Sequence, residues 1–172
     1  MGSSPGSGFS ITGSNDPEAA YRLQLAAART RIKPAAGWLD WIAILSIVNA
    51  VIAMSNGQFS FLLGLGITLL ANGMAARGDI SSIVSLLITG AAAAFFWLMG
   101  RFAKMGQKWA LILGMLVYAL DGVVLLLLPV QPWLMVGFHV FALIMLARAF
   151  GAINTFEAVK ADAQAHGVLL DQ

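Results

Sequence analysis

Two titratable residues, Asp121 and His139, lie inside otherwise uncharged apolar stretches. A carboxylate beside an imidazole can serve as a proton relay, because histidine titrates in an accessible pH range, or as a structural clamp. The short connection at residues 129–132 predicts an antiparallel helix hairpin. Both residues then lie roughly 13–14 Å along their helices from its midpoint, at ~1.5 Å per residue. Since an unpaired charge in hydrocarbon costs at least ~2.5–3.5 kcal/mol, we expect the two side chains to touch.

Three further polar residues are predicted to share this interior. Asn49 and Thr89 fall in the outer half of their apolar stretches, on faces that carry other small or polar residues. Tyr118 precedes Asp121 by one helical turn on the same face. Membrane helices use such faces to approach and bond one another. The sequence therefore predicts one interior polar cluster, made of Asn49, Thr89, Tyr118, Asp121 and His139.

The composition of the chain indicates that the predicted polar cluster lies on membrane-spanning helices. The chain has 172 residues, of which 59% are hydrophobic and 10% charged, and its mean hydropathy is +0.83. A soluble domain carries roughly 25% charged residues, so a water-soluble globular protein is excluded. The absence of cysteine excludes disulfides and thiolate chemistry. The apolar segments occupy residues 38–54, 59–71, 80–100, 109–128 and 133–147.

The second apolar segment is the doubtful span. It is short and carries Gly64 and Gly66, whereas crossing ~30 Å of hydrocarbon takes about 20 residues. If residues 59–76 form a re-entrant or interfacial half-helix, nine of the ten lysines and arginines lie on the inner side, with Arg77 the exception. The positive-inside rule favours that arrangement. We therefore expect an all-α membrane bundle of four transmembrane helices plus one half-helix, with both termini cytoplasmic.

The charged residues outside the apolar segments define the flanks. Residues 1–35 are predicted to form a flexible tail and a cytoplasmic amphipathic helix that begins near Asp16 and stops before Pro34. That helix lies on an anionic membrane surface or is solvated, and composition favours the two alternatives equally. Residues 36–150 form the bundle. Residues 151–172 continue the last span as a cytoplasmic helix that ends near Gly167.

Other chemistries find no support in the sequence. A single intramembrane histidine cannot supply a two-histidine haem site, and it is weak evidence for a pigment ligand. The run Gly64-Leu65-Gly66 has no preceding strand and no third glycine, so it is not a dinucleotide fingerprint. No metal-ligand spacing is present, and a net charge of +2 does not indicate nucleic acid. Asp40 is expected to be a helix-start acid near the positive end of the dipole.

The segments FSFLLGLGIT, KWALILGMLVYALDG and FHVFAL give the chain a resemblance to known sequences. It resembles a loose group of uncharacterised small bacterial polytopic inner-membrane proteins that share W-A-x-x-x-G-M-x-x-Y-A-L-D-G followed by F-H-x-F-A-L. Here the pattern runs from Trp109 to Gly122 and from Phe138 to Leu143, and the similarity covers roughly residues 38–150. The resemblance implies a bacterial inner-membrane location and no mechanism.

Two functions remain open from the sequence. The first is an accessory or structural subunit of a larger membrane assembly, with the lipid bilayer and a membrane protein or a second copy of the chain as partners. The second is a small proton-coupled carrier that uses Asp121 and His139. The lack of a catalytic motif or an internal repeat favours the first. We expect no enzymatic activity, no cofactor and no nucleic-acid partner.

Overall fold

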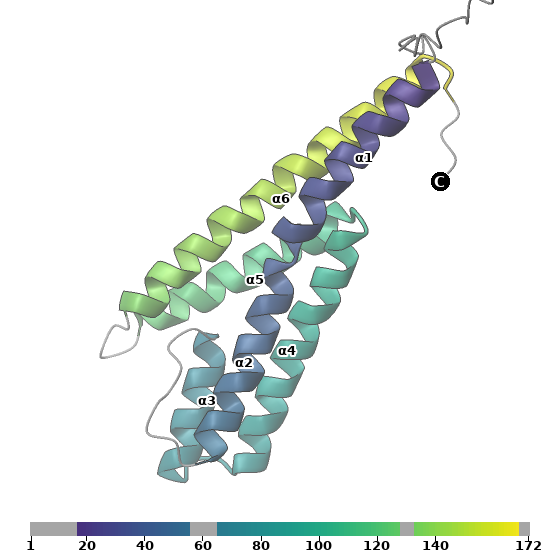
Figure 1. The fold of residues 1–172 in the computed structure, drawn as a ribbon. Helices are drawn as coiled ribbons and strands as arrows, with labels where there is room; N and C mark the ends of the chain where they lie inside the picture. The colour runs from purple at the N-terminus through teal and green to yellow at the C-terminus, as the bar shows by residue number, and fades with distance from the viewer. Residues whose placement is uncertain (1–16, 56–64, 128–132, 169–172) are drawn as a thin grey trace, which may run out of the picture.

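The computed structural model describes residues 17–55, 65–127 and 133–168, and within these residues the secondary structure is helical (Figure 1). This confirms the predicted all-α fold class. The helices are α1 (Pro17–Ala36), α2 (Trp38–Met54), α3 (Gly66–Arg77), α4 (Ser82–Lys104), α5 (Lys108–Leu126) and α6 (Trp133–Ala165).

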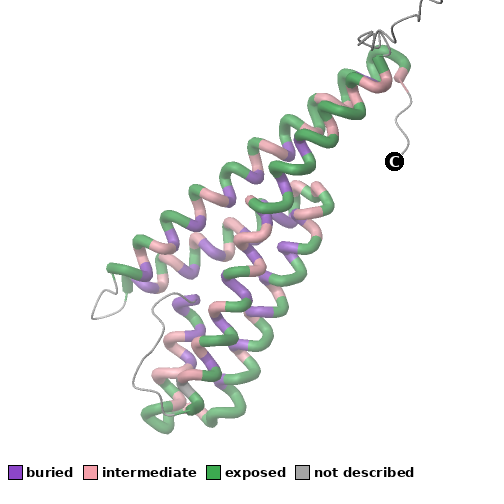
Figure 2. The backbone as a smooth tube through the Cα atoms, viewed as in Figure 1, coloured by how far each residue is buried: buried purple, intermediate pink, exposed green. Residues whose placement is uncertain are grey.

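Four helices of the described chain are long and apolar enough to cross a membrane: α4, α5, α6 and the bent helix that α1 and α2 form together. Their outward faces carry large apolar side chains, among them Ile83, Leu87 and Leu120, which are 71%, 67% and 58% exposed. Figure 2 shows buried positions along the facing sides of the helices and exposed positions on the outside. A soluble monomer rarely exposes an apolar patch beyond roughly 300–600 Å², so this outer surface suits lipid. The chain has the architecture of a small multi-pass membrane protein.

Helix α3 is too short to span a membrane. Its 12 residues extend about 18 Å at ~1.5 Å per residue, against ~30 Å of hydrocarbon. It begins against α5 inside the bundle and ends at Gly78, whose left-handed backbone (φ +83°) caps the helix before α4. The end of α2 and the start of α4 therefore lie at the same end of the molecule (Figure 1). Four spans plus a half-helix are confirmed, while residues 59–64 of the predicted half-helix fall outside the described residues.

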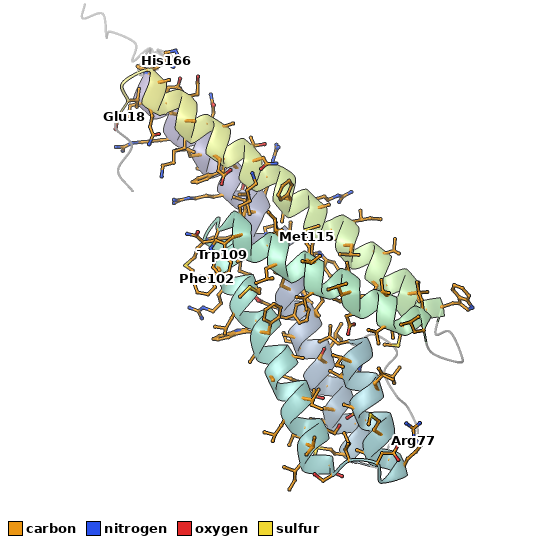
Figure 3. All side chains as sticks on the ribbon, turned by 180° about the vertical axis from the view of Figure 1, so that it is seen from behind. Glu18, Arg77, Phe102, Trp109, Met115 and His166 are labelled. Atoms are coloured by element: carbon orange, nitrogen blue, oxygen red, sulfur yellow. The ribbon has the colours of Figure 1, made fainter. Side chains whose placement is uncertain are left out.

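The spans meet through small side chains. Ala103, Ala142 and Ala149 are completely buried, and a Cβ added to Gly114 would lie 3.1 Å from Leu39 Cδ2. Small residues of this kind let membrane helices approach closely. The α5–α6 hairpin crosses the α2–α4 pair at an angle (Figures 1 and 3). The core consequently forms where these helices and the end of α1 converge.

The prediction that the first helix stops before Pro34 is wrong, because α1 continues to Ala36. A proline inside a helix removes a hydrogen bond and costs ~3 kcal/mol or more, but packing overrides this penalty here. Ile32 and Ala36, on either side of the proline, are 2% and 0% exposed. The chain then passes through Gly37, whose N–H donates to the carbonyl of Lys33 at 3.0 Å, and continues into α2.

Helix α1 packs along the C-terminal half of α6, a partner that neither sequence alternative for this helix included. At the far end of the pair, Tyr21 Oη donates a hydrogen bond to Asp162 Oδ2 at 2.7 Å. Figure 3 shows Glu18 and His166 together at this end of the molecule and Arg77 at the opposite end. The described ends of the chain therefore lie side by side, on one side of the bundle.

Helix α6 is unbroken over its 33 residues, which extend about 50 Å at ~1.5 Å per residue. The predicted helical continuation beyond the last apolar segment is confirmed. Gly167 follows the helix with φ +72°, and the N–H of Val168 donates to the carbonyl of Ala163 at 3.0 Å, as in a glycine-terminated helix. The first half of α6 belongs to the bundle and the second half pairs with α1. We call α1 together with residues 150–165 of α6 the stalk.

Candidate functional site

Asp121 lies on the inward face of α5, one turn after Tyr118, and its side chain is 6% exposed. The carboxylate accepts a hydrogen bond from the N–H of Gly66 at 2.6 Å and another from the N–H of Ile67 at 2.9 Å. It also faces Nε2 of His139 on α6 at 2.9 Å. The predicted contact between Asp121 and His139 is therefore confirmed, and the carboxylate has gained a third helix as a partner.

The hydrogen bond to Met135 places a proton on Nδ1 of His139. Nδ1 lies 2.9 Å from the carbonyl oxygen of Met135, and because a carbonyl can only accept, Nδ1 carries a proton. The contact between Nε2 and Asp121 Oδ2 then holds one further proton, which resides on either atom. The pair is neutral overall in both arrangements. A neutral, hydrogen-bonded pair is the form in which an acid and a base are tolerated in hydrocarbon.

The two N–H donors belong to the first turn of α3. A helix leaves its first N–H groups without intrahelical acceptors, and it carries a partial positive charge at that end. In hydrocarbon each unsatisfied group costs several kcal/mol, so the Asp121 carboxylate meets both needs. Gly66 permits the approach, because a Cβ there would lie 2.8 Å from Leu125 Cδ2 and 3.1 Å from the Asp121 carbonyl oxygen.

Aromatic packing sets the plane of the imidazole. The Tyr118 ring stacks on His139 with centroids 4.3 Å apart and an angle of 7° between the planes, and Phe96 of α4 meets Tyr118 edge-on at 6.0 Å. A Cβ at Gly122 would lie 3.2 Å from His139 Cδ2, so this glycine lets the ring lie close to α5. We call Tyr118, Asp121, His139 and the first two N–H groups of α3 the polar centre.

Asn49 and Thr89 are not hydrogen-bonded to this centre in the described part of the chain. Thr89 is buried on α4, at 1% exposed, and Asn49 is half-buried on α2. The atoms Asn49 Oδ1, Thr89 Oγ1 and Tyr118 Oη are buried and have no hydrogen-bond partner among the described residues. Of the five residues predicted to cluster, the structure joins Tyr118, Asp121 and His139. Residue spacing predicts only how far along their helices Asn49 and Thr89 lie. It does not predict which side chains they contact.

A second interhelical polar contact joins α2 to α4. Asp40 lies in the first turn of α2, as predicted, where the helix dipole favours a carboxylate. Lys104 Nζ of α4 donates to its Oδ2, with side chains 33% and 24% exposed for Lys104 and Asp40. Gly100 makes room for the pair, because a Cβ there would overlap Asp40 Oδ1. The sequence did not predict this ion pair.

The polar centre contains an acid and a base that share a hydrogen bond and connect three helices. Both oxygens of Asp121 and both ring nitrogens of His139 are hydrogen-bonded. Over residues 17–55, 65–127 and 133–168, no group of three His, Asp or Glu side chains gathers as metal ligands do. The centre can keep one proton between an acid and a base, and it fixes three helices relative to one another.

The N–H donors of Gly66 and Ile67 were missed from the sequence, although a signal for them existed. A half-helix that starts within hydrocarbon must find an acceptor for its first N–H groups. Asp121, an acid within an apolar segment, is the acceptor that the sequence offers inside the bundle. No protein-family model, curated protein or solved structure matches the chain, so what this centre does is argued from its own geometry.

Proposed function

We propose that the chain is an accessory or structural subunit of a larger membrane assembly in the bacterial inner membrane. In this proposal the polar centre locks the bundle, and the stalk reaches a partner on the cytoplasmic side. The observation that carries it is the full engagement of Asp121, which binds α3 and α6 at once. A carboxylate held in this way serves rigidity, because moving it leaves buried N–H groups unpaired.

The form of the stalk supports the same proposal. It extends beyond the bundle as a pair of packed helices (Figure 1), and it carries charged side chains of both signs. Leu23 on α1 is 73% exposed although it lies outside the apolar spans. An exposed leucine among charged residues suits contact with a protein surface. The orientation with the stalk in the cytoplasm rests on the distribution of lysine and arginine.

The mass of the full chain, purified from its native membrane in a mild detergent, tests this function. We expect a second protein in fixed ratio, and we expect Leu23→Glu to release it without changing the helix content. Met105→Glu is the matched control, since Met105 is 63% exposed in the α4–α5 connection and lies outside the stalk. A monomer or a homo-oligomer without a second protein contradicts the proposal.

One observation favours a proton-coupled carrier as the second candidate. The single proton shared by Asp121 and His139 can move between them without a change in net charge. A carrier predicts proton flux in liposomes that contain the purified chain, and loss of that flux in the double variant Asp121→Asn/His139→Gln. Liposomes of the unmodified chain that show no flux above empty liposomes contradict this candidate and leave the first one standing.

A further inference from the structure

A groove of about 630 Å³ runs between α1 and α6 where the stalk meets the bundle. Its walls include Gln24, Arg31 and Trp38 from the joined helix α1–α2, and Met145, Arg148 and Thr155 from α6. Alanines fill most of the remaining wall. The groove is therefore lined mainly by small side chains, with two guanidinium groups among them.

The charge of this groove is unbalanced. Arg31 and Arg148 are both exposed, and neither has a hydrogen bond or ion pair within the described residues. None of the described residues that line the groove is acidic. Two lysines outside the groove have acidic partners, since Lys104 is paired with Asp40 and Lys108 lies 3.4 Å from Glu157. The two groove arginines are left to bind an anion from outside the chain.

The depth of the groove identifies the source of that anion. Trp38 is the first residue of α2, at the start of an apolar span, and Arg148 is the first Lys, Arg, Asp or Glu residue of α6. The groove thus crosses the level at which apolar side chains give way to charged ones. Tryptophan and arginine concentrate at this level in membrane proteins, where phospholipid headgroups lie. Met145 and Trp38 continue the lining below the arginines, on the apolar side.

We propose that this groove binds an anionic phospholipid, with its phosphodiester held by Arg31 and Arg148 and an acyl chain lying along Trp38 and Met145. Guanidinium groups bind phosphate oxygens through paired, charge-assisted hydrogen bonds. Basic pockets between membrane helices are the sites at which anionic headgroups bind. The site would join the stalk to the bundle through a lipid, since Arg31 belongs to the stalk and Arg148 to the part of α6 that lies in the bundle.

Lipid counting by native mass spectrometry of the detergent-purified full chain tests the proposal. The probes are dioleoylphosphatidylglycerol and, as the zwitterionic control, dioleoylphosphatidylcholine. We expect selective retention of phosphatidylglycerol, and a rise in thermal unfolding temperature on its addition. The double variant Arg31→Gln/Arg148→Gln should bind it at least about tenfold more weakly, because each hydrogen bond to a charged group contributes on the order of a tenfold effect or more.

Two further variants separate the groove from general surface charge. Arg101→Gln/Lys160→Gln removes the same number of cations from positions that do not line the groove, and it should keep phosphatidylglycerol binding. Gly151→Phe retains both arginines but fills the groove, and it should weaken binding. A Cβ at Gly151 meets no atom of a neighbouring helix within 4 Å among the described residues, so no neighbouring backbone there obstructs this change.

Three outcomes overturn the proposal. Equal retention of the two lipids shows that the groove does not select an anionic headgroup. Equal loss in Arg101→Gln/Lys160→Gln assigns the effect to total charge. Displacement of phosphatidylglycerol by millimolar inorganic phosphate identifies a free-anion site in place of a lipid site. If the double arginine variant loses its helix content, the test rests on Gly151→Phe alone. Undiminished phosphatidylglycerol binding by Gly151→Phe then contradicts the proposal.

Discussion

Asp121 and Asp40 are two carboxylates that each lie against the N-terminus of a helix, and their hydrogen-bond and ion-pair partners differ. Asp121 is 6% exposed and reaches the start of another helix, where it meets two N–H groups and an imidazole. Asp40 is 24% exposed, lies in the first turn of its own helix and has Lys104 as its ion-pair partner. Its second oxygen, Oδ1, is buried and has no hydrogen-bond partner among the described residues.

The difference follows from depth. A carboxylate within hydrocarbon has only protein groups to bind, so every acceptor position must be met by the fold. Asp40, at 24% exposed, forms an ion pair that water partly screens. We therefore expect the energies of these two sites to differ severalfold, and the following variants test that difference, from the largest expected effect to the smallest.

Asp121→Ala should have the largest effect. It leaves His139 and the first two N–H groups of α3 without their acceptor, and removing one member of a buried pair costs ~3–5 kcal/mol. Equilibrium unfolding in mixed micelles, followed by far-ultraviolet circular dichroism, measures this loss. Asp121→Asn, which keeps one acceptor oxygen, should fall between the unmodified chain and Asp121→Ala. A loss below ~1 kcal/mol for Asp121→Ala would remove the contrast with Asp40.

Gly66→Ala should destabilise the chain by about 1–3 kcal/mol, as overpacking of a close contact does. The new Cβ would lie 2.8 Å from Leu125 Cδ2 and would push the start of α3 away from Asp121. Gly73→Ala in the same helix is the matched control, because a Cβ there meets nothing within 4 Å in the described part of the chain. That control should be neutral, or stabilising by ~0.5–1 kcal/mol through helix propensity. Equal unfolding free energies for the two variants would show that α3 does not depend on this close approach.

Asp40→Asn should cost only about 0.2–1 kcal/mol, the range of a partly exposed ion pair. Added salt should reduce the difference between this variant and the unmodified chain, since salt screens charges that water can reach. The same salt titration of Asp121→Ala should change its unfolding free energy much less. A salt-independent loss at Asp40 would place its ion pair in the same dry environment as Asp121.

Tyr21 provides the weakest test, at a carboxylate that is exposed. Its phenol donates to Asp162 at 2.7 Å, and this hydrogen bond, followed by burial and charge repulsion, raises the pKa of Tyr21 above its ordinary value of 10.0. The folded chain thus prefers the protonated phenol. The resulting stability is fully present below pH 10.0 and is lost as the pH rises through the raised pKa.

Ultraviolet absorbance of tyrosinate measures this shift. The chain has two tyrosines, so Tyr118→Phe leaves Tyr21 as the only signal. The Tyr118 hydroxyl has no partner among the described residues, which makes that background a mild one. Asp162→Ala should return the midpoint of Tyr21 toward its ordinary value. An unchanged midpoint would show that the hydrogen bond at the end of the stalk does not persist in solution.

Hydrophobic periodicity and charge placement were sufficient to predict the spans and the half-helix. Matched distances from the turn were sufficient for the contact between Asp121 and His139, since an antiparallel hairpin leaves only rotation undetermined. The N–H donors of Gly66 and Ile67 were not predictable in this way. The position of the first residue of a half-helix depends on how far the preceding segment enters the bundle. Residue spacing along the chain does not give that distance.

The stalk shows a second limit of sequence reasoning. Local rules place a helix end before Pro34, yet α1 continues because Ile32 and Ala36 are buried by packing. The pairing of α1 with α6 brings together residues more than 100 positions apart, such as Tyr21 and Asp162. A weakly patterned helix gives no indication of which distant helix will cover it. The same applies to Asp40 and Lys104, whose pairing depends on how α2 and α4 are rotated.

Because α6 is unbroken, it can act as a rigid lever. We consider a pivot at Ala149, which is completely buried. One arm then runs about 24 Å to Ala165 and the other about 15 Å to His139, at ~1.5 Å per residue. A sideways displacement of 1 Å at the stalk end therefore moves His139 by roughly 0.6 Å in the opposite direction. Directed along the line from Nε2 to Oδ2, that movement lengthens the 2.9 Å contact with Asp121 to about 3.5 Å, beyond the ordinary hydrogen-bond range. A rigid α6 would thus carry a displacement of the stalk to the contact between Asp121 and His139.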